Sequence, residues 1–139
     1  MGSLSSTLCF AGILLFVLGL ATGFAIPAFR SSRIGLSAHL TGVQSGTFLV
    51  ALGLLWPKIA LWPSLDGAIG NAIWVSLYAV YGSLVLAAAF GAGRDLPIAG
   101  GGISTTRGKQ IAVTALMGTG SIVVLLALAA LLIGWQWRA

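Results

Sequence analysis

Charged residues are scarce in this sequence. Only 6% of the 139 residues are Asp, Glu, Lys or Arg, whereas soluble domains usually contain about 25%. Seven of the charges are Lys or Arg, two are Asp, and the mean hydropathy is +1.07. This balance excludes an ordinary soluble globule. The net charge of +5 does not indicate a nucleic-acid partner, because the cations flank apolar segments, where they orient a membrane protein.

Cysteine is represented by one residue, Cys9, in the first apolar stretch. It has no intramolecular disulfide partner, so cysteine usage does not indicate the cellular compartment. No basic residue precedes this stretch, although a signal peptide requires one. We therefore expect the first apolar stretch to be retained as a helix.

Four uninterrupted apolar stretches lie between the charges, and each is long enough to cross a bilayer, which takes roughly 20 residues. Prolines or glycines follow the first three. The expected spans are residues 7–26, 36–56, 68–90 and 110–135, each within a few residues. Short connections between them predict an all-α fold, in which residues 1–139 form one integral-membrane domain, a four-helix up-down bundle.

The distribution of basic residues predicts the orientation of this bundle. The first and third connections contain five cations, and the opposite side contains two. By the positive-inside rule, both connections face the cytoplasm, which places the protein in a bacterial inner membrane. All five tryptophans fall at helix ends on the other side, as an aromatic belt would. The five cations are Arg30, Arg33, Arg94, Arg107 and Lys109; the opposite two are Lys58 and Arg138; the tryptophans are Trp56, Trp62, Trp74, Trp135 and Trp137.

Glycine spacing indicates how the first two helices pack. Each helix has three glycines at a spacing of seven and then four residues, which places them on one helical face where another backbone can approach. The second helix also has a polar face away from its glycines, so it must touch two sets of neighbours. We therefore expect a homo-oligomer. The glycines are Gly12, Gly19 and Gly23, then Gly35, Gly42 and Gly46; the polar residues are Ser37, Thr41 and Gln44.

The expected spans contain no Asp, Glu, Lys or Arg, although intramembrane charges usually mark ion paths and proton relays. Proton-coupled export, which depends on a membrane-embedded carboxylate in the small four-helix multidrug exporters, is therefore disfavoured. A glutathione-using membrane enzyme is disfavoured for the same reason, because it needs arginines and carboxylates in its site.

His39, the one histidine, is the best candidate for chemistry within the spans. It lies about one turn into the second expected helix, on the same face as Gly42 and Gly46. An imidazole can ligate a metal or haem, or act as a base, and the two glycines would let a flat macrocycle lie against the backbone. The alternative is an interfacial histidine in contact with headgroups or water. A zinc site is excluded because it needs three or four ligands.

A stripe of hydrogen-bonding and aromatic residues marks the third helix: Asn71, Trp74, Tyr78 and Tyr81, at spacings of three, four and three. Buried tyrosines need partners for their hydroxyls, so this pair either ties helices together or lines a pocket for an aromatic substrate. The glycine-rich third connection matches no phosphate-binding motif, and we expect a turn-rich loop over the bundle end beside His39.

Four segments stand out in order along the chain: GLSAHLTGVQSGTF at 35–48, LYAVY at 77–81, GAG at 91–93 and PIAG at 97–100. Together they resemble the hydroxylaminobenzene mutases and, more distantly, styrene oxide isomerase. The resemblance runs over nearly the whole chain. It implies a homotrimer in which His39 is the axial ligand of a ferric haem b that acts as a Lewis acid. Two positions depart from the family pattern, because Ser45 and Ser83 stand where the family motifs carry Asn. Serine lacks the amide and the reach of Asn, which leaves the substrate open.

The leading hypothesis from the sequence is a membrane-bound mutase that rearranges an aryl hydroxylamine to an aminophenol. His39, with Gly42 and Gly46, would bind the haem, and Tyr78, Tyr81, Ser45 and Ser83 would orient a small apolar aromatic substrate. A haem-dependent epoxide isomerase with a carbonyl product is one alternative. A non-catalytic haem-binding membrane protein is another.

Overall fold

The computed structural model describes residues 3–62, 64–94, 96, 99–100 and 102–137. The described chain contains four long helices, α1 (Ser3–Ala25), α2 (Ser32–Leu55), α3 (Asp66–Phe90) and α4 (Arg107–Gly134). Each is long and apolar enough to cross a membrane. One-turn helices η1 (Ile26–Ala28) and η2 (Trp56–Lys58) follow α1 and α2. Arg138 and the Pro97–Ile98 part of the PIAG motif lie outside the described residues.

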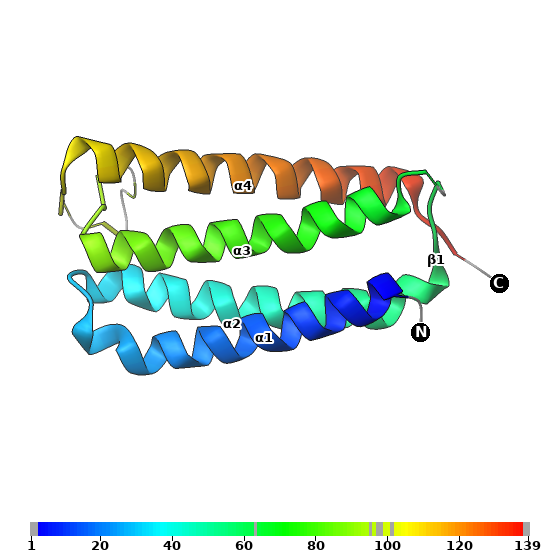
Figure 1. The fold of residues 1–139 in the computed structure, drawn as a ribbon, viewed down its shortest axis with the longest axis horizontal. Coiled ribbons are helices and arrows are strands. Elements are labelled where there is room, and N and C mark those ends of the chain that lie inside the picture. The colour runs from blue at the N-terminus through cyan, green and yellow to red at the C-terminus, as the bar shows by residue number, and fades with distance from the viewer. Residues whose placement is uncertain (1–2, 63, 95, 97–98, 101, 138–139) are drawn as a thin grey trace.

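Figure 1 shows the four helices side by side along the long axis of the molecule. Helices α1 and α2 form one closely packed pair, α3 and α4 form another, and α2 and α3 join the pairs. The N- and C-terminal ends lie at one end of the bundle together with the α2–α3 connection. The α1–α2 and α3–α4 connections lie at the other end.

All four helices begin a few residues before the expected apolar spans. The side chain of Ser31 caps α2 by accepting a hydrogen bond from the Ile34 amide at 3.4 Å, so the helix begins at Ser32. Arg33 therefore lies in the first turn of α2, and Arg107 and Lys109 lie in the first turn of α4. Polar and charged residues are stable in a first turn, where they reach water, and hydropathy does not detect them.

A short strand pair at the end with the chain termini was not expected from the sequence. Strand β1 (Ile59–Ala60) pairs antiparallel with β2 (Gln136–Trp137), with Ile59 opposite Trp137. Two-residue strands are too short to produce an alternating pattern. The pair connects the segment after α2 to the segment after α4.

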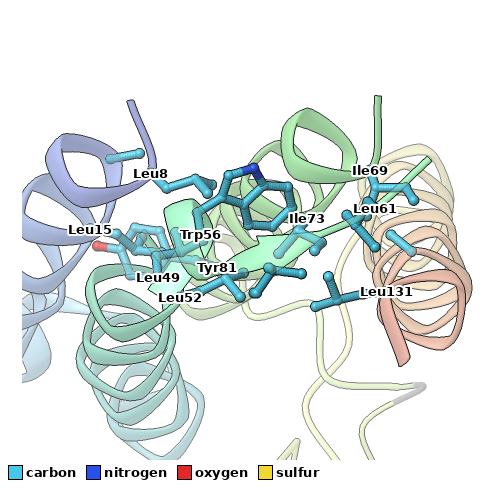
Figure 2. Close-up of a cluster of buried hydrophobic side chains, with 13 residues drawn as sticks. Leu8, Leu15, Leu49, Leu52, Trp56, Leu61, Ile69, Ile73, Tyr81 and Leu131 are labelled. Carbon is cyan, nitrogen blue, oxygen red and sulfur yellow. The ribbon is translucent and has the colours of Figure 1, made fainter. Parts of the chain in front are cut away.

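The buried side chains form two clusters. The larger lies towards the β1–β2 end and is shown in Figure 2, where Leu8, Leu49 and Ile73 surround Trp56. Trp56 lies at the end of α2, as the sequence predicts, but it is only 5% exposed, so in the single chain it packs in the core. The smaller cluster lies towards the opposite end and includes Ile34, Ala38, Ala87 and Ala92.

The α3–α4 loop folds back onto this second cluster. Ala92 is fully buried beside residues of α2 and α3, and Leu96 and Ala99 pack against the same cluster. Gly91 ends α3 with a φ of +70°, a left-handed conformation that favours glycine, and so lets the loop turn back.

Glycines bring the backbones of α1 and α2 into direct contact, as their spacing predicts. A Cβ added at Gly12 would lie 2.7 Å from the Gly46 carbonyl oxygen, and one added at Gly19 would lie 2.6 Å from the Val43 nitrogen. Real Cβ atoms do not approach this closely, so the contact requires glycine. Gly35 departs from this pattern, because it packs against the Phe29 ring.

The polar face of α2, opposite its glycine face, is at least partly exposed in the single chain. Gln44 is exposed there, and Ser37 and Thr41 are partly exposed. These are the polar residues for which the sequence predicts a further neighbour.

Candidate functional site

The site forms around His39 in the half of the bundle near the α1–α2 connection. Because α2 begins at Ser32, His39 lies about two turns inside the helix, or about 10 Å from its start, rather than one turn. The side chain is partly buried and points towards α1. Its polar contact is with the backbone of α1, which disfavours a histidine that only contacts lipid headgroups or water at the membrane interface.

One imidazole nitrogen of His39 is bound to the backbone of α1. The Nδ1 atom lies 2.8 Å from the carbonyl oxygen of Gly19. A carbonyl only accepts hydrogen bonds, so Nδ1 carries the proton and donates it. In the neutral ring Nε2 then holds the lone pair, and it forms no hydrogen bond with any other described residue. The histidine thus presents one basic nitrogen that is available to a ligand.

Gly23 makes room for this ring. A Cβ added at Gly23 would lie 2.8 Å from Nδ1 and 3.1 Å from Cε1 of His39. Gly19 supplies the acceptor, and Gly23, four residues later on the same face of α1, supplies the space. The sequence pattern identified both as packing glycines but did not show that their neighbour is the histidine.

Gly42 and Gly46 lie against α1 in the single chain. A Cβ at Gly42 would meet the Gly19 Cα at 2.7 Å and the Tyr81 ring at 2.9 Å, and one at Gly46 would meet the Phe16 nitrogen at 2.5 Å. Both glycines therefore serve the contact that holds α1 against α2. A direct role for them in binding a cofactor stays a prediction.

Tyr81 is 8% exposed and connects α3 to α1 beside Gly42. Its hydroxyl donates to the Leu18 carbonyl at 2.9 Å and is hydrogen-bonded to the Thr22 hydroxyl at 2.5 Å. The Thr22 hydroxyl also lies 2.8 Å from the same Leu18 carbonyl oxygen, so the two hydroxyl protons are shared among these three contacts. Thr22 was not identified from the sequence, although it follows Gly19 by three residues and so shares its face of α1.

Tyr78 makes a second connection of the same kind. Its hydroxyl donates to the Ala11 carbonyl of α1 at 2.7 Å, and its ring meets Trp74 edge to face at 5.8 Å between centroids. The two tyrosines thus tie α3 to α1, which is one of the two roles that the sequence left open. Their rings also place aromatic surface next to the α1–α2 contact.

The two serines lie in different surroundings. Ser83 is fully buried and donates to the Val80 carbonyl at 2.7 Å. It lies seven residues after Ser76, whose carbonyl faces Gly120 of α4, so it belongs to the α4 side of α3 and away from His39. Ser45 is partly buried on α2 and forms no hydrogen bond with the rest of the described chain.

No cluster of three or more His, Cys, Asp or Glu that could hold a metal ion exists among the described residues. His39 therefore brings a single strong ligand. That donor set suits a cofactor whose metal already has its other ligands, such as haem.

Comparison with known proteins identifies the family. The family model for styrene oxide isomerase matches residues 4–136. The chain belongs to the styrene oxide isomerase family. Hydroxylaminobenzene mutase HabB of Ectopseudomonas oleovorans is 46% identical over 101 residues, which cover 71% of this chain and 61% of HabB. Hydroxylaminobenzene mutase HabA of the same organism is 38% identical over 111 residues, which cover 77% of this chain and 80% of HabA.

These matches confirm the resemblance that the sequence motifs indicate. The chain spans about three fifths of HabB, the relative with the higher identity of these two. Membership of the styrene oxide isomerase family, together with two relatives named as mutases, supports an isomerase.

Proposed function

We propose that this protein is a membrane-bound mutase that rearranges an aryl hydroxylamine to an aminophenol. Both named relatives are hydroxylaminobenzene mutases, which supports this substrate class. The observation that carries the proposal is the geometry of His39, whose Nδ1 is bound to the Gly19 carbonyl while Nε2 has no partner in the described chain. Such a histidine is fixed to α1 through Nδ1 and leaves Nε2 to act as a ligand or a base.

Haem b is the cofactor that we propose, with His39 as its axial ligand. The hydrogen bond from Nδ1 to a backbone carbonyl is the usual second contact of a metal-binding histidine, because it fixes the tautomer and the ring orientation. When bound, ferric haem would supply a Lewis acid that weakens the N–O bond of the substrate. Gly42 and Gly46 would contribute by holding α2 against α1 and so fixing the position of His39.

The other proposed site residues would bind and shield the substrate. Tyr78 and Tyr81 supply an aromatic surface for the substrate ring, while their hydroxyls are satisfied by α1 carbonyls. Ser45 has a hydroxyl that is free to hydrogen-bond a substrate oxygen, whereas Ser83 would act indirectly through the position of α3. Apolar surroundings keep water scarce, so that the oxygen returns to the ring rather than to solvent.

We further propose that the protein is a homotrimeric up-down bundle in the bacterial inner membrane, with the first and third connections cytoplasmic. The exposed Gln44 and the partly exposed Ser37 and Thr41 support an assembly in which a second copy covers this face of α2. Polar side chains in a membrane are stabilised by partners across a helix interface. The five cations at one end support the orientation.

A second candidate function is the isomerisation of an epoxide to a carbonyl compound. It is favoured by the family model, which is named for styrene oxide isomerase. The substitution of serine for the family asparagine at Ser45 also permits a different substrate. A third candidate, a non-catalytic haem-binding protein, would use His39 in the same way without turnover.

The test is turnover by purified protein of hydroxylaminobenzene and, separately, of styrene oxide, without NAD(P)H or peroxide and without O₂. Formation of an aminophenol supports the first function, and formation of a carbonyl compound from the epoxide alone supports the second. Haem without turnover of either would support the binding protein. In ¹⁸O-labelled water, the aminophenol should remain unlabelled, and substantial labelling would contradict a water-poor rearrangement.

The cofactor has a separate test. The purified protein should show the Soret band of b-type haem, and His39→Ala should abolish it. Full haem content and an unchanged spectrum in this variant would contradict the assignment of His39.

A further inference from the structure

Five cations lie at the end of the bundle that holds the α1–α2 and α3–α4 connections, and they differ in their surroundings. Arg30 donates to the Phe90 carbonyl at 3.2 Å, and the Lys109 ammonium lies 4.6 Å from the centroid of the Phe90 ring. Arg94 and Arg107 are exposed and form no hydrogen bond or ion pair with another described residue. No described residue therefore compensates the charges of these two guanidinium groups.

Arg94 and Arg107 line one cavity of about 800 Å³ between the α3–α4 loop and the start of α4. Ser104, Thr105 and Thr114 contribute hydroxyls to its wall, and no carboxylate lies among its described lining residues. Guanidinium and hydroxyl donors match the oxygens of a phosphate group.

A second cavity of about 260 Å³ adjoins the first, because Gln110 and Thr114 line both. Its remaining wall is mostly apolar and includes Leu96, Val113 and Met117. It continues along α4 past Gly118, where an added Cβ would meet no described atom within 4 Å, to Ser121. The two cavities together change from cationic at the helix end to apolar along the helix.

This change follows the axis of a helix that is long enough to cross a membrane. Arg107 is the first residue of α4, so the cationic cavity lies at the level of lipid headgroups and the apolar cavity lies at the level of the acyl chains. A soluble anion would use only the first cavity.

We propose that these joined cavities are a binding site for an anionic phospholipid. The phosphate lies between Arg94 and Arg107, and an acyl chain lies along α4 over Val113, Met117 and Gly118. A second copy of the chain offers few anionic groups to the cationic cavity, because the whole sequence has two acidic residues. Asp66 begins α3 at the opposite end of the bundle, and Asp95, which follows Arg94, lies outside the described residues. A zwitterionic lipid carries the same phosphate but also a cationic headgroup, so it compensates the two arginines less well than an anionic lipid.

The test is native mass spectrometry of the full-length protein in detergent, titrated with phosphatidylglycerol and with phosphatidylcholine of the same acyl chains. Phosphatidylglycerol should bind at least about fivefold more tightly, and Arg94→Gln and Arg107→Gln should each reduce its affinity by about fivefold. Arg33→Gln is the matched control, because Arg33 is an exposed cation in the first turn of α2 and does not line the cavity. It should leave the affinity unchanged.

Three outcomes would overturn the proposal. Equal affinities for the two lipids would show that the headgroup charge does not matter. An affinity loss in Arg33→Gln equal to that in the cavity variants would show general electrostatic attraction rather than a specific site. Displacement of the lipid by millimolar inorganic phosphate would show a phosphate site without an acyl-chain contribution. A fourth measurement addresses a second copy: Thr114→Cys in a Cys9→Ser background should form no disulfide-linked dimer, and efficient dimer formation would assign this face to a protein interface.

Discussion

The imidazole of His39 is held by two glycines of the neighbouring helix, one through its carbonyl and one through its lack of a side chain. Gly19 accepts the Nδ1 proton, and Gly23 leaves the space in which the ring lies. A backbone carbonyl cannot change its protonation state or rotate away, so it fixes the ring tautomer more firmly than a side-chain acceptor would.

Gly23→Ala should displace the His39 ring, because its Cβ would lie 2.8 Å from Nδ1. In haem-free protein labelled with ¹⁵N-histidine, the variant should lose the single tautomer. With the proposed haem bound, its absorption spectrum should shift. Gly82→Ala is the control, since a Cβ there meets no described atom within 4 Å and alanine favours the helix by about 1 kcal/mol. An unchanged tautomer in Gly23→Ala would contradict the positioning role.

Tyr78→Phe and Tyr81→Phe should each destabilise the protein by about 1 kcal/mol, because each removes one hydrogen bond between α3 and α1. Tyr81→Phe should cost more, since it also removes the contact between the Tyr81 and Thr22 hydroxyls, although Thr22 keeps the Leu18 carbonyl. Unfolding in mixed micelles with increasing SDS measures both. If neither variant changes the unfolding midpoint, the tyrosines do not tie the helices together.

The sequence predicts which side chains of the site matter but not the backbone groups that they bind. His39, Tyr78 and Tyr81 were selected from the sequence because their side chains can do chemistry. Their partners, the carbonyls of Gly19, Ala11 and Leu18, carry no sequence signal, because every residue has a carbonyl. The choice between tying helices and lining a pocket therefore needed the structure.

At the scale of the helices, the contact between α1 and α2 depends on glycine. A Cβ added at Gly12 would lie 2.7 Å from the Gly46 carbonyl oxygen, and one added at Gly46 would lie 2.7 Å from the Gly12 carbonyl oxygen. The seven-then-four spacing was sufficient to predict a glycine face of this kind. The spacing did not reveal which helix would meet it. The early helix starts and the β1–β2 pair were also missed, because capped first turns are polar and two-residue strands have no period.

Gly46→Leu should separate α1 from α2 and destabilise the protein by at least about 2 kcal/mol, because its Cβ alone would lie 2.5 Å from the Phe16 nitrogen. The same SDS titration measures this loss, and haem content should fall in parallel because His39 moves with α2. Gly82→Leu introduces the same side chain where no described atom lies within 4 Å of a Cβ. Equal stability of the two variants would argue against a backbone contact.

At the scale of the whole molecule, one face of α2 remains without a partner in a single chain. A Gln44→Cys variant in a Cys9→Ser background should form disulfide-linked dimers in membranes if copies meet across this face. The matched control is Leu125→Cys, an exposed position on α4. Cross-linking at Leu125 but not at Gln44 would place the interface elsewhere.

The proposed chemistry makes a second prediction for the assembled protein. Turnover should fall when dithionite reduces the sample, because ferrous iron is a weaker Lewis acid than ferric iron. Activity is measured anaerobically before reduction, after reduction and after reoxidation. Equal activity in all three states would contradict a Lewis-acid isomerase that depends on ferric haem.

The pairing of α1 with α2 has a consequence for how the protein is made. Translation completes Ser3–Leu55 before α3 emerges, so the glycine-lined hairpin can insert and close as the first unit. The acceptor carbonyls of Ala11 and Leu18 are then in place for the tyrosines of α3. Helix α4, which packs mainly on α3, joins last, and the β1–β2 pair fastens the finished chain to the segment made after α2. The environment of His39 is thus settled early in synthesis, before the final helix enters the membrane.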